Sequence, residues 1–292
     1  GDKRPGVGLG AHGLPEFVWC KVPAGTVRLV IKGDQDTPDQ EVERTVDHPF
    51  FIAKTPVTLK QFAAFVGKLE GQTPYKEETW WQGLGKGADQ WFHNKPVPQL
   101  PDLPNRPAQY VSWYQAIAYA RWLTAQYQTQ RLLPAEARVR LPTEWEWQLA
   151  ATGGNPDYHY PWGTEWNPGY ASNKEGLNQL VAVGLYPHGR SPVGALDMSG
   201  NAYEWCLNAF DDLDNLDETG SVPRTTRGGA WFTQASIAGE VSEALSVFSR
   251  LRDNANGQNA RGDRIVVAIR LVCDVPPSDA LVDNRGSQSP WV

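Results

Sequence analysis

The stretch VGLYPHGRSPVGALDMSGNAYEW, residues 183–205, carries the strongest signal for the fold. It mixes glycine, proline and asparagine with short apolar runs and ends on a tryptophan. The whole chain has the same character, with 28 glycines and 13 tryptophans against one methionine. Glycine permits tight turns, and tryptophan attaches a loop to a core because it buries a large apolar area. The sequence therefore predicts an irregular, loop-rich fold.

The chain is long enough for one large domain with a tail at each end. It has 292 residues, and single domains of roughly 200 to 250 residues are common among mixed folds. Residues 1–13 have too little apolar content to pack, and residues 276–292 are polar. We therefore expect a single domain over residues 14–275 with short N-terminal and C-terminal tails.

The charge pattern disfavours polyanionic partners. Charged residues make up 21% of the chain and the net charge is −6, with lysine and arginine scattered. Because no basic stripe appears, we expect no nucleic-acid partner. No apolar run reaches the roughly 18 residues of a membrane span, so membrane insertion is not expected. No secretion signal is visible, which favours a cytoplasmic location; a surface or secreted location stays open, because a removed signal leaves no trace.

Apolar runs and turn residues predict the strands. The segment FVWCKVPAGTVRLVI, residues 17–31, indicates a β-hairpin that turns at Pro23, Ala24 and Gly25. The segment 48–58 indicates another strand, and residues 264–275, RIVVAIRLVCDV, indicate a buried terminal strand.

Three serine or threonine residues predict helix starts. Thr58 with Gln61, and Thr143 with Glu146, have the spacing of a capping box, in which each side chain bonds the other residue's backbone. Another helix begins at Ser112 with apolar residues on one face. Between the first two of these helices along the chain, residues 71–109 contain six prolines and four glycines in no period, which predicts a long irregular excursion.

Several words in order carry a resemblance to a known family. They are VSWYQAIAYARWL, RLPTEWEWQLAATGG, YPWG, the stretch at residues 183–205, and RGGAW at residues 227–231. This series resembles the formylglycine-generating enzyme, or sulfatase-modifying factor, family across residues 14–275. The resemblance implies an α+β class and a C-type lectin-like fold, with a few short helices around small antiparallel sheets.

The residues that would carry the family's chemistry are absent. The resemblance implies two copper-binding cysteines shortly after the RGG word, and the matching positions hold Thr233 and Ala238. Copper(I) requires soft thiolates, which a hydroxyl or methyl group cannot replace. We therefore expect no copper and no oxidation of a substrate cysteine. Cys206 and Cys273 are expected to be buried free thiols.

Iron is not expected either. A related branch of the fold uses nonheme iron held by closely spaced histidines, and the five histidines here are isolated. Three widely separated cysteines outside any C-x-x-C spacing argue against a disulfide framework and a zinc site. The acidic run DDLDNLDE at residues 211–218 is interpreted as a solvated loop.

One metal site is implied by the resemblance. In the family a structural calcium ion lies in a loop that matches Asp197, Gly200, Ala202 and Glu204, with side-chain oxygens at the ends and backbone carbonyls between. Oxygen ligands suit this hard cation. The alternative is that Glu204 caps a backbone group or pairs with an arginine.

The C-terminal region resembles a binding surface. RGGAW, residues 250–261 and AIRLV at residues 268–272 follow the outline of the non-catalytic variable proteins of diversity-generating retroelements. Their mutable positions lie in the stretch that matches residues 230–272 here. Apolar area, adaptable hydroxyls and anchoring arginines are typical of paratopes. The candidate ligand-binding residues are Phe232, Thr233, Gln234, Ser236, Ile237, Ser246, Phe248, Arg250 and Arg252.

Two functions follow from these patterns. The favoured one is a non-catalytic ligand-binding protein that recognises an unknown protein or other macromolecule. It predicts that Phe232, Thr233, Gln234 and Phe248 are exposed on one face. The alternative is an atypical metal-dependent oxidase of the sulfatase-modifying family.

Overall fold

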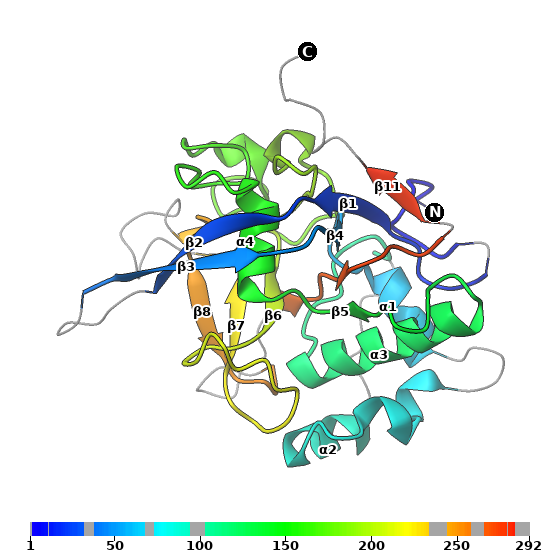
Figure 1. The fold of residues 1–292 in the computed structure, drawn as a ribbon. Helices are drawn as coiled ribbons and strands as arrows, with labels where there is room; N and C mark the ends of the chain where they lie inside the picture. Colours follow the sequence, from blue (N-terminus) through cyan, green and yellow to red (C-terminus); the bar gives the residue numbers. More distant parts are fainter. Residues whose placement is uncertain are drawn as a thin grey trace.

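Short strands and helices surround an aromatic core, which confirms the predicted α+β class (Figure 1). The computed structural model describes residues 2–10, 12–31, 38–67, 73–93, 103–233, 244–257, 266–278 and 280–283. Its strands form a five-stranded sheet in the order β11-β1-β4-β10-β5, a two-stranded ribbon of β2 and β3, and a four-stranded sheet in the order β8-β7-β6-β9.

The five-stranded sheet brings both halves of the chain together. Its members are β1 (Val18–Val22), β4 (Phe50–Ala53), β5 (Val139–Arg140), β10 (Val272–Cys273) and β11 (Leu281–Asp283). β10 lies between β4 and β5 and pairs with both in antiparallel fashion. Strands more than 200 residues apart in sequence are therefore neighbours in this sheet.

The hairpin predicted for residues 17–31 is wrong in its pairing. β1 pairs with β4, whereas β2 (Gly25–Ile31) pairs along its whole length with β3 (Gln40–Val46). Pro23 separates two strands that enter different sheets, and a proline between strands cannot donate to a ladder. The turn residues are right, but they mark a change of sheet.

The four-stranded sheet carries the C-terminal region. It consists of β6 (Tyr203–Ala209), β7 (Arg224–Arg227), β8 (Arg250–Asp253) and β9 (Val267–Ala268), with β8 at one end of the strand order. The buried strand predicted for residues 264–275 is divided. β9 and β10 belong to different sheets, and Arg270, between them, donates to Glu204 in β6 and to the carbonyl of Ala53 in β4.

The three predicted helix starts are confirmed. They are α1 (Leu59–Val66), α3 (Trp113–Thr129) and α4 (Glu144–Thr152), each with a complete capping box at Thr58, Ser112 and Thr143. Such a cap stabilises a helix by about 1 kcal/mol because it satisfies an otherwise unpaired backbone N–H. α1 and α3 meet through aromatic rings, with 5.4 Å between the centroids of Phe65 and Trp122. None of the helices among the described residues is long and apolar enough to span a membrane.

The segment predicted as an irregular excursion contains short helices. They are η1 (Pro74–Lys76), η2 (Glu78–Trp81) and α2 (Lys86–His93), and Trp81 packs into the core. Two further short helices, η3 (Pro168–Tyr170) and η4 (Pro187–Gly189), lie in the loop-rich half of the chain.

The N-terminal residues predicted to be a tail pack on the domain. Val7 is buried, and its carbonyl accepts a hydrogen bond from the Thr58 hydroxyl. The Gln61 side chain donates to the carbonyl of Gly6, and Arg4 donates to the carbonyl of Val183. These contacts could not be predicted from residue types, because they use backbone carbonyls, which every residue carries.

The turn at residues 197–201 explains the second glycine, Gly200, in the stretch GALDMSGNAYEW. Gly200 has φ of +77°, and a Cβ atom there would lie 2.3 Å from the carbonyl oxygen of Ser172. Only glycine fits such a position. Its N–H donates to the carbonyl of Gly228 at 2.7 Å, so this turn holds the end of β7 in place.

Candidate functional site

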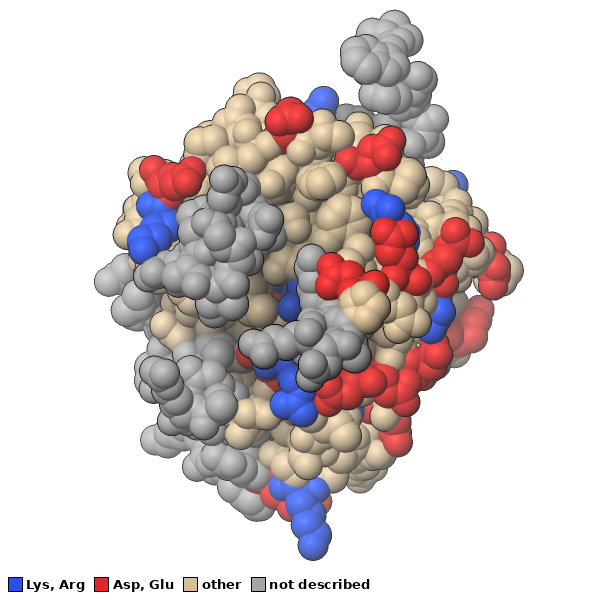
Figure 2. Space-filling model, turned by 90° about the vertical axis from the view of Figure 1, so that its left-hand side faces the viewer, with Lys and Arg blue, Asp and Glu red and all other residues tan. Residues whose placement is uncertain are grey.

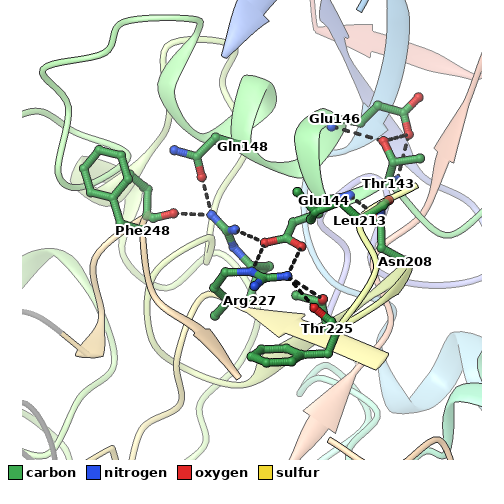
Figure 3. Close-up of polar contacts among 12 residues, drawn as sticks. Thr143, Glu144, Glu146, Gln148, Asn208, Leu213, Thr225, Arg227 and Phe248 are labelled. Atoms are coloured by element: carbon green, nitrogen blue, oxygen red, sulfur yellow. Dashed lines mark hydrogen bonds and ion pairs between the residues drawn. The ribbon is translucent and has the colours of Figure 1, made fainter. Parts of the chain in front are cut away.

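A buried carboxylate holds β7 and β8 against α4. The Glu144 side chain has no exposed surface, and its Oε1 accepts from Arg227 Nη1 and from Arg250 Nε, both at 2.6 Å (Figure 3). Its Oε2 accepts from Arg250 Nη2 at 2.9 Å. Gln148 and the carbonyl of Val247 accept further hydrogen bonds from Arg227. Burial raises the pKa of Glu144, and the two arginines outweigh it, so the pKa lies below its ordinary value.

Thr233 closes a small turn beyond β7. Its N–H donates to the carbonyl of Ala230 at 3.0 Å, and its hydroxyl accepts from the N–H of Ala230 at 2.8 Å. The hydroxyl also lies 3.0 Å from the phenol oxygen of Tyr203. Thr233 is 6% exposed, so its side chain supports the turn and does not face solvent.

Phe232 projects from the same turn and is 38% exposed. Its ring stands edge-to-face against Trp231, with 5.3 Å between centroids, and near Tyr203 at 6.3 Å. Edge-to-face pairs fix the direction of a ring without burying it. Phe232 is therefore presented to solvent by a supported frame.

β8 adds an apolar and a cationic side chain to the exposed area. Leu251 is 39% exposed, and the Arg252 side chain is 53% exposed with an ion pair to Asp211 at 3.1 Å. The Arg250 side chain is instead directed into the core, where it pairs with Glu144. Figure 2 views the molecule from the side that is on the left in Figure 1, where acidic side chains gather along one edge of the face.

The comparisons with known proteins agree on the family. The family model "Sulfatase-modifying factor enzyme 1-like domain" matches residues 11–274. The chain belongs to this family. The match covers nearly all of the domain expected at residues 14–275, and the family's C-type lectin-like fold is the architecture described above.

Relatives within the sulfatase-modifying family include enzymes and an inactive member. The chain is 30% identical over 274 residues to a formylglycine-generating enzyme of Thermomonospora curvata, covering 74% of this chain and 82% of that one. It is 31% identical to a hercynine oxygenase of Mycobacterium tuberculosis, covering 66% of this chain and 48% of that one. It is 28% identical to an inactive C-alpha-formylglycine-generating enzyme 2 of Mus musculus, covering 75% and 73%. This chain therefore spans about half the length of the oxygenase.

A solved structure with the same fold is Treponema denticola variable protein 1. It superposes with a TM-score of 0.57 at 20% identity and covers 89% of this chain and 95% of that one. The family thus includes enzymes and an inactive member, and the same fold occurs in a variable protein. Activity has to be argued from the residues of the site.

The cysteines of this family member lie in its core. Cys20, Cys206 and Cys273 are buried, and no disulfide bond joins them. Burial raises the pKa of the Cys206 and Cys273 thiols well above the ordinary value, which keeps them protonated. A protonated buried thiol is a poor metal ligand and a poor nucleophile.

The calcium site implied for Asp197, Gly200, Ala202 and Glu204 does not fit the geometry. Both oxygens of Glu204 accept from Arg270 at 2.7 Å, and Oε2 also accepts from the indole N–H of Trp147 at 2.7 Å. Arg270 therefore neutralises the Glu204 charge that would attract the cation. This is the alternative in which Glu204 pairs with an arginine. The carbonyl of Gly200 accepts from the N–H of Ala202. The Asp197 carboxylate accepts from the N–H of Gly184, and burial raises its pKa to about 6.

The exposure predicted for the binding residues is partly wrong. Thr233, Ser246 and Arg250 are buried, because Tyr203, local backbone groups and Glu144 respectively hold their polar atoms. Phe248 is half-buried between His159 and Arg28. Phe232 is exposed as predicted, the candidate residue Arg252 is also exposed, and the exposed Leu251 was not among the candidates. The remaining positions, Gln234, Ser236, Ile237 and Ala238, lie outside the described residues.

The acidic run lies in an exposed loop, as predicted. Asp211 and Asp214 pair with Arg252 and Arg44, each at 3.1 Å, through side chains that are mostly exposed. Asp217 accepts from the N–H of Thr219. These contacts tie the loop to the strands beside it. Within the described part of the chain, no group of three or more His, Cys, Asp or Glu side chains is placed to hold a metal ion.

Proposed function

We propose that this family member is a non-catalytic ligand-binding protein whose C-terminal region, about residues 230–272, presents a surface to a protein or other macromolecule. The observation that carries the proposal is the hydrogen-bonded hydroxyl of Thr233. This residue stands where the resemblance places a catalytic cysteine, and its hydroxyl is committed to Ala230 and Tyr203. A neutral, hydrogen-bonded hydroxyl is neither a soft copper ligand nor a redox group.

The exposed side chains of the frame suit recognition. Phe232 supplies an aromatic anchor, Leu251 adds apolar area, and Arg252 adds a cation. Aromatic and arginine side chains dominate binding energy at protein interfaces. The buried Glu144 cluster keeps β7 and β8 in place beneath them, so the surface can vary while its support does not. We propose that this chain is one of the variable proteins of diversity-generating retroelements.

An atypical metal-dependent oxidase is the second candidate, because the chain is 30% identical to a formylglycine-generating enzyme. Incubation with copper(I), oxygen and a cysteine-containing peptide separates the two. We expect no aldehyde above the protein-free background, since a hydroxyl at Thr233 replaces the expected thiolate. Mass spectrometry after capture with a hydrazine probe measures the product.

The Thermomonospora curvata relative is the positive control for this assay. Thr233→Cys alone is also expected to be inactive, because the side chain is buried against Tyr203 and the second family position, Ala238, carries a methyl group. Aldehyde formed by the unaltered chain, together with stoichiometric copper, would favour the oxidase.

The diversified surface has its own test in the neighbouring DNA. We expect a near-copy of the codons for residues 230–272 beside a reverse transcriptase gene, with differences concentrated at adenines. Sequencing of the source genome reads this directly. If no such copy exists, the chain is a non-diversified member, and the binding proposal then rests on Thr233 and the exposed frame alone.

A further inference from the structure

An aromatic hollow is lined by residues outside the region 230–272 just proposed as a binding surface. The loop between α4 and η3, together with Tyr170 of η3, lines an open hollow of about 480 Å³. This loop is the green segment near β2 at the top of Figure 1. The lining of the hollow includes Tyr158, Trp162, Glu165, Trp166, Asn167 and Tyr170. Neither the family chemistry nor the proposed binding surface uses these residues.

The rings that line the hollow are inclined to one another. Trp162 stacks on the buried Tyr160, with 5.3 Å between centroids and 11° between planes. The Trp166 ring is inclined to the Trp162 ring by 41°, with 5.8 Å between centroids. The Tyr170 ring is nearly perpendicular to the Trp162 ring, at 83°, with 5.6 Å between centroids. The inclined rings form a concave corner, which differs from the flat aromatic surface on which a sugar ring stacks. A compact group inside the corner meets more than one ring.

Hydrogen bonds hold the rings in place. The indole N–H of Trp162 donates to the carbonyl of Glu165 at 2.9 Å, and that of Trp166 donates to Glu175 Oε2 at 3.3 Å. Asn167 caps η3 by accepting from the N–H of Gly169 at 2.9 Å. A site whose rings are already oriented loses less entropy when a ligand binds.

The electrostatics of the hollow favour a cation. Glu165 is among its lining residues, Glu175 contacts Trp166 from outside, and both side chains are exposed. No lysine or arginine is among the lining residues of the described chain. Aromatic faces carry negative potential and attract a cation within about 6 Å of the ring centroid. The centroids of Trp166 and Tyr170 lie 5.8 and 5.6 Å from that of Trp162, so one compact cation in the corner can satisfy this distance for two rings.

We propose that this hollow, the aromatic corner, binds an organic cation of the quaternary ammonium class. A trimethylammonium head fills the corner between Trp162, Trp166 and Tyr170, with Glu165 compensating its charge. The rest of the ligand leaves through the open side of the hollow. This site goes beyond the proposed function, because it does not depend on whether residues 230–272 vary.

Calorimetric titration of the full chain with choline tests the proposal. The control ligand is dimethylbutanol, in which an uncharged carbon replaces the choline nitrogen. We expect choline to bind at least about tenfold more tightly than this isostere, because only the cation gains from the ring potential. Equal affinity for both ligands, or no heat from choline at tens of millimolar, would overturn the proposal.

Variants locate the site. Trp166→Leu keeps apolar area and removes the ring, and we expect about a tenfold loss of choline affinity. Glu165→Gln is expected to weaken binding about threefold, because its carboxylate is exposed and screened. Trp80→Leu makes the same exchange at a half-buried tryptophan outside the hollow and is the matched control, with unchanged affinity. Thermal melts of each variant show that it is folded. Unchanged choline affinity in folded Trp166→Leu would place the ligand elsewhere and refute the assignment.

Discussion

Replacing Glu144 by alanine is expected to lower the free energy of unfolding by about 3–5 kcal/mol. The carboxylate has no exposed surface, and it is the shared partner of Arg227 and Arg250, whose side chains are 1% and 3% exposed. Without it, two guanidinium groups stay buried beside neutral acceptors such as Gln148 and the carbonyl of Phe210. Urea denaturation followed by circular dichroism measures the loss.

A matched control distinguishes this cluster from ordinary surface pairs. Asp211→Ala removes the partner of Arg252, and the two side chains of that pair are 64% and 53% exposed. Solvent screens such a pair, so the expected loss is below about 1 kcal/mol. Similar losses in both variants would mean that the Glu144 cluster does not support β7 and β8 as described.

The same cluster predicts a dependence on pH. The pKa of Glu144 lies below its ordinary value of 4.5, since Arg227 and Arg250 outweigh the effect of burial. A carboxylate with a lowered pKa contributes stability above its unfolded pKa, and the contribution disappears as the pH falls. The unaltered chain should therefore lose more stability on acidification below pH 4.5 than Glu144→Gln does.

Arg270→Met is the second substitution with a large expected effect. Its guanidinium bonds both oxygens of Glu204 and the carbonyls of Ala53 and Leu196, all at 2.7 Å. Methionine fills similar volume but leaves Glu204 buried without a counterion, so we expect a loss of about 3–5 kcal/mol. Urea denaturation gives the magnitude.

A double-mutant cycle tests the cause of this loss. If the unpaired charge dominates, Arg270→Met with Glu204→Gln should be more stable than Arg270→Met alone, because no carboxylate is stranded. Strictly additive losses would contradict the ion-pair explanation. Arg140→Met serves as a milder control, since the Arg140 side chain is 21% exposed and its pair with Glu146 is reached by solvent.

Local signals in the sequence were sufficient for the helices. Thr58, Ser112 and Thr143 each begin a helix because the capping partner lies three residues away in the same segment. The pairing of β2 was not predictable in this way. Its partner β3 begins at Gln40, and no residue near Pro23 indicates that β1 belongs to another sheet.

The candidate site was predictable only where exposure follows from position on a turn or an edge. Phe232 is exposed because its neighbours form a supported turn. The Arg250 side chain is buried because its guanidinium donates hydrogen bonds to Glu144, 106 residues earlier. No local sequence pattern around Arg250 indicates this partner. The aromatic corner was missed for a related reason: the word YPWG indicated a family, whereas the hollow depends on how Trp166 and Tyr170 are placed around it.

The position of β10 has a consequence for synthesis of the protein. β10 fills the space between β4 and β5, so those two strands have no partner between them until Val272 and Cys273 have been made. A nascent chain that has emerged from the ribosome only as far as β8 already contains Phe232, Leu251 and Arg252, but its five-stranded sheet is still open. Closure waits for the last part of the domain to leave the exit tunnel. Ribosome-bound chains arrested before and after Cys273 should differ sharply in resistance to protease.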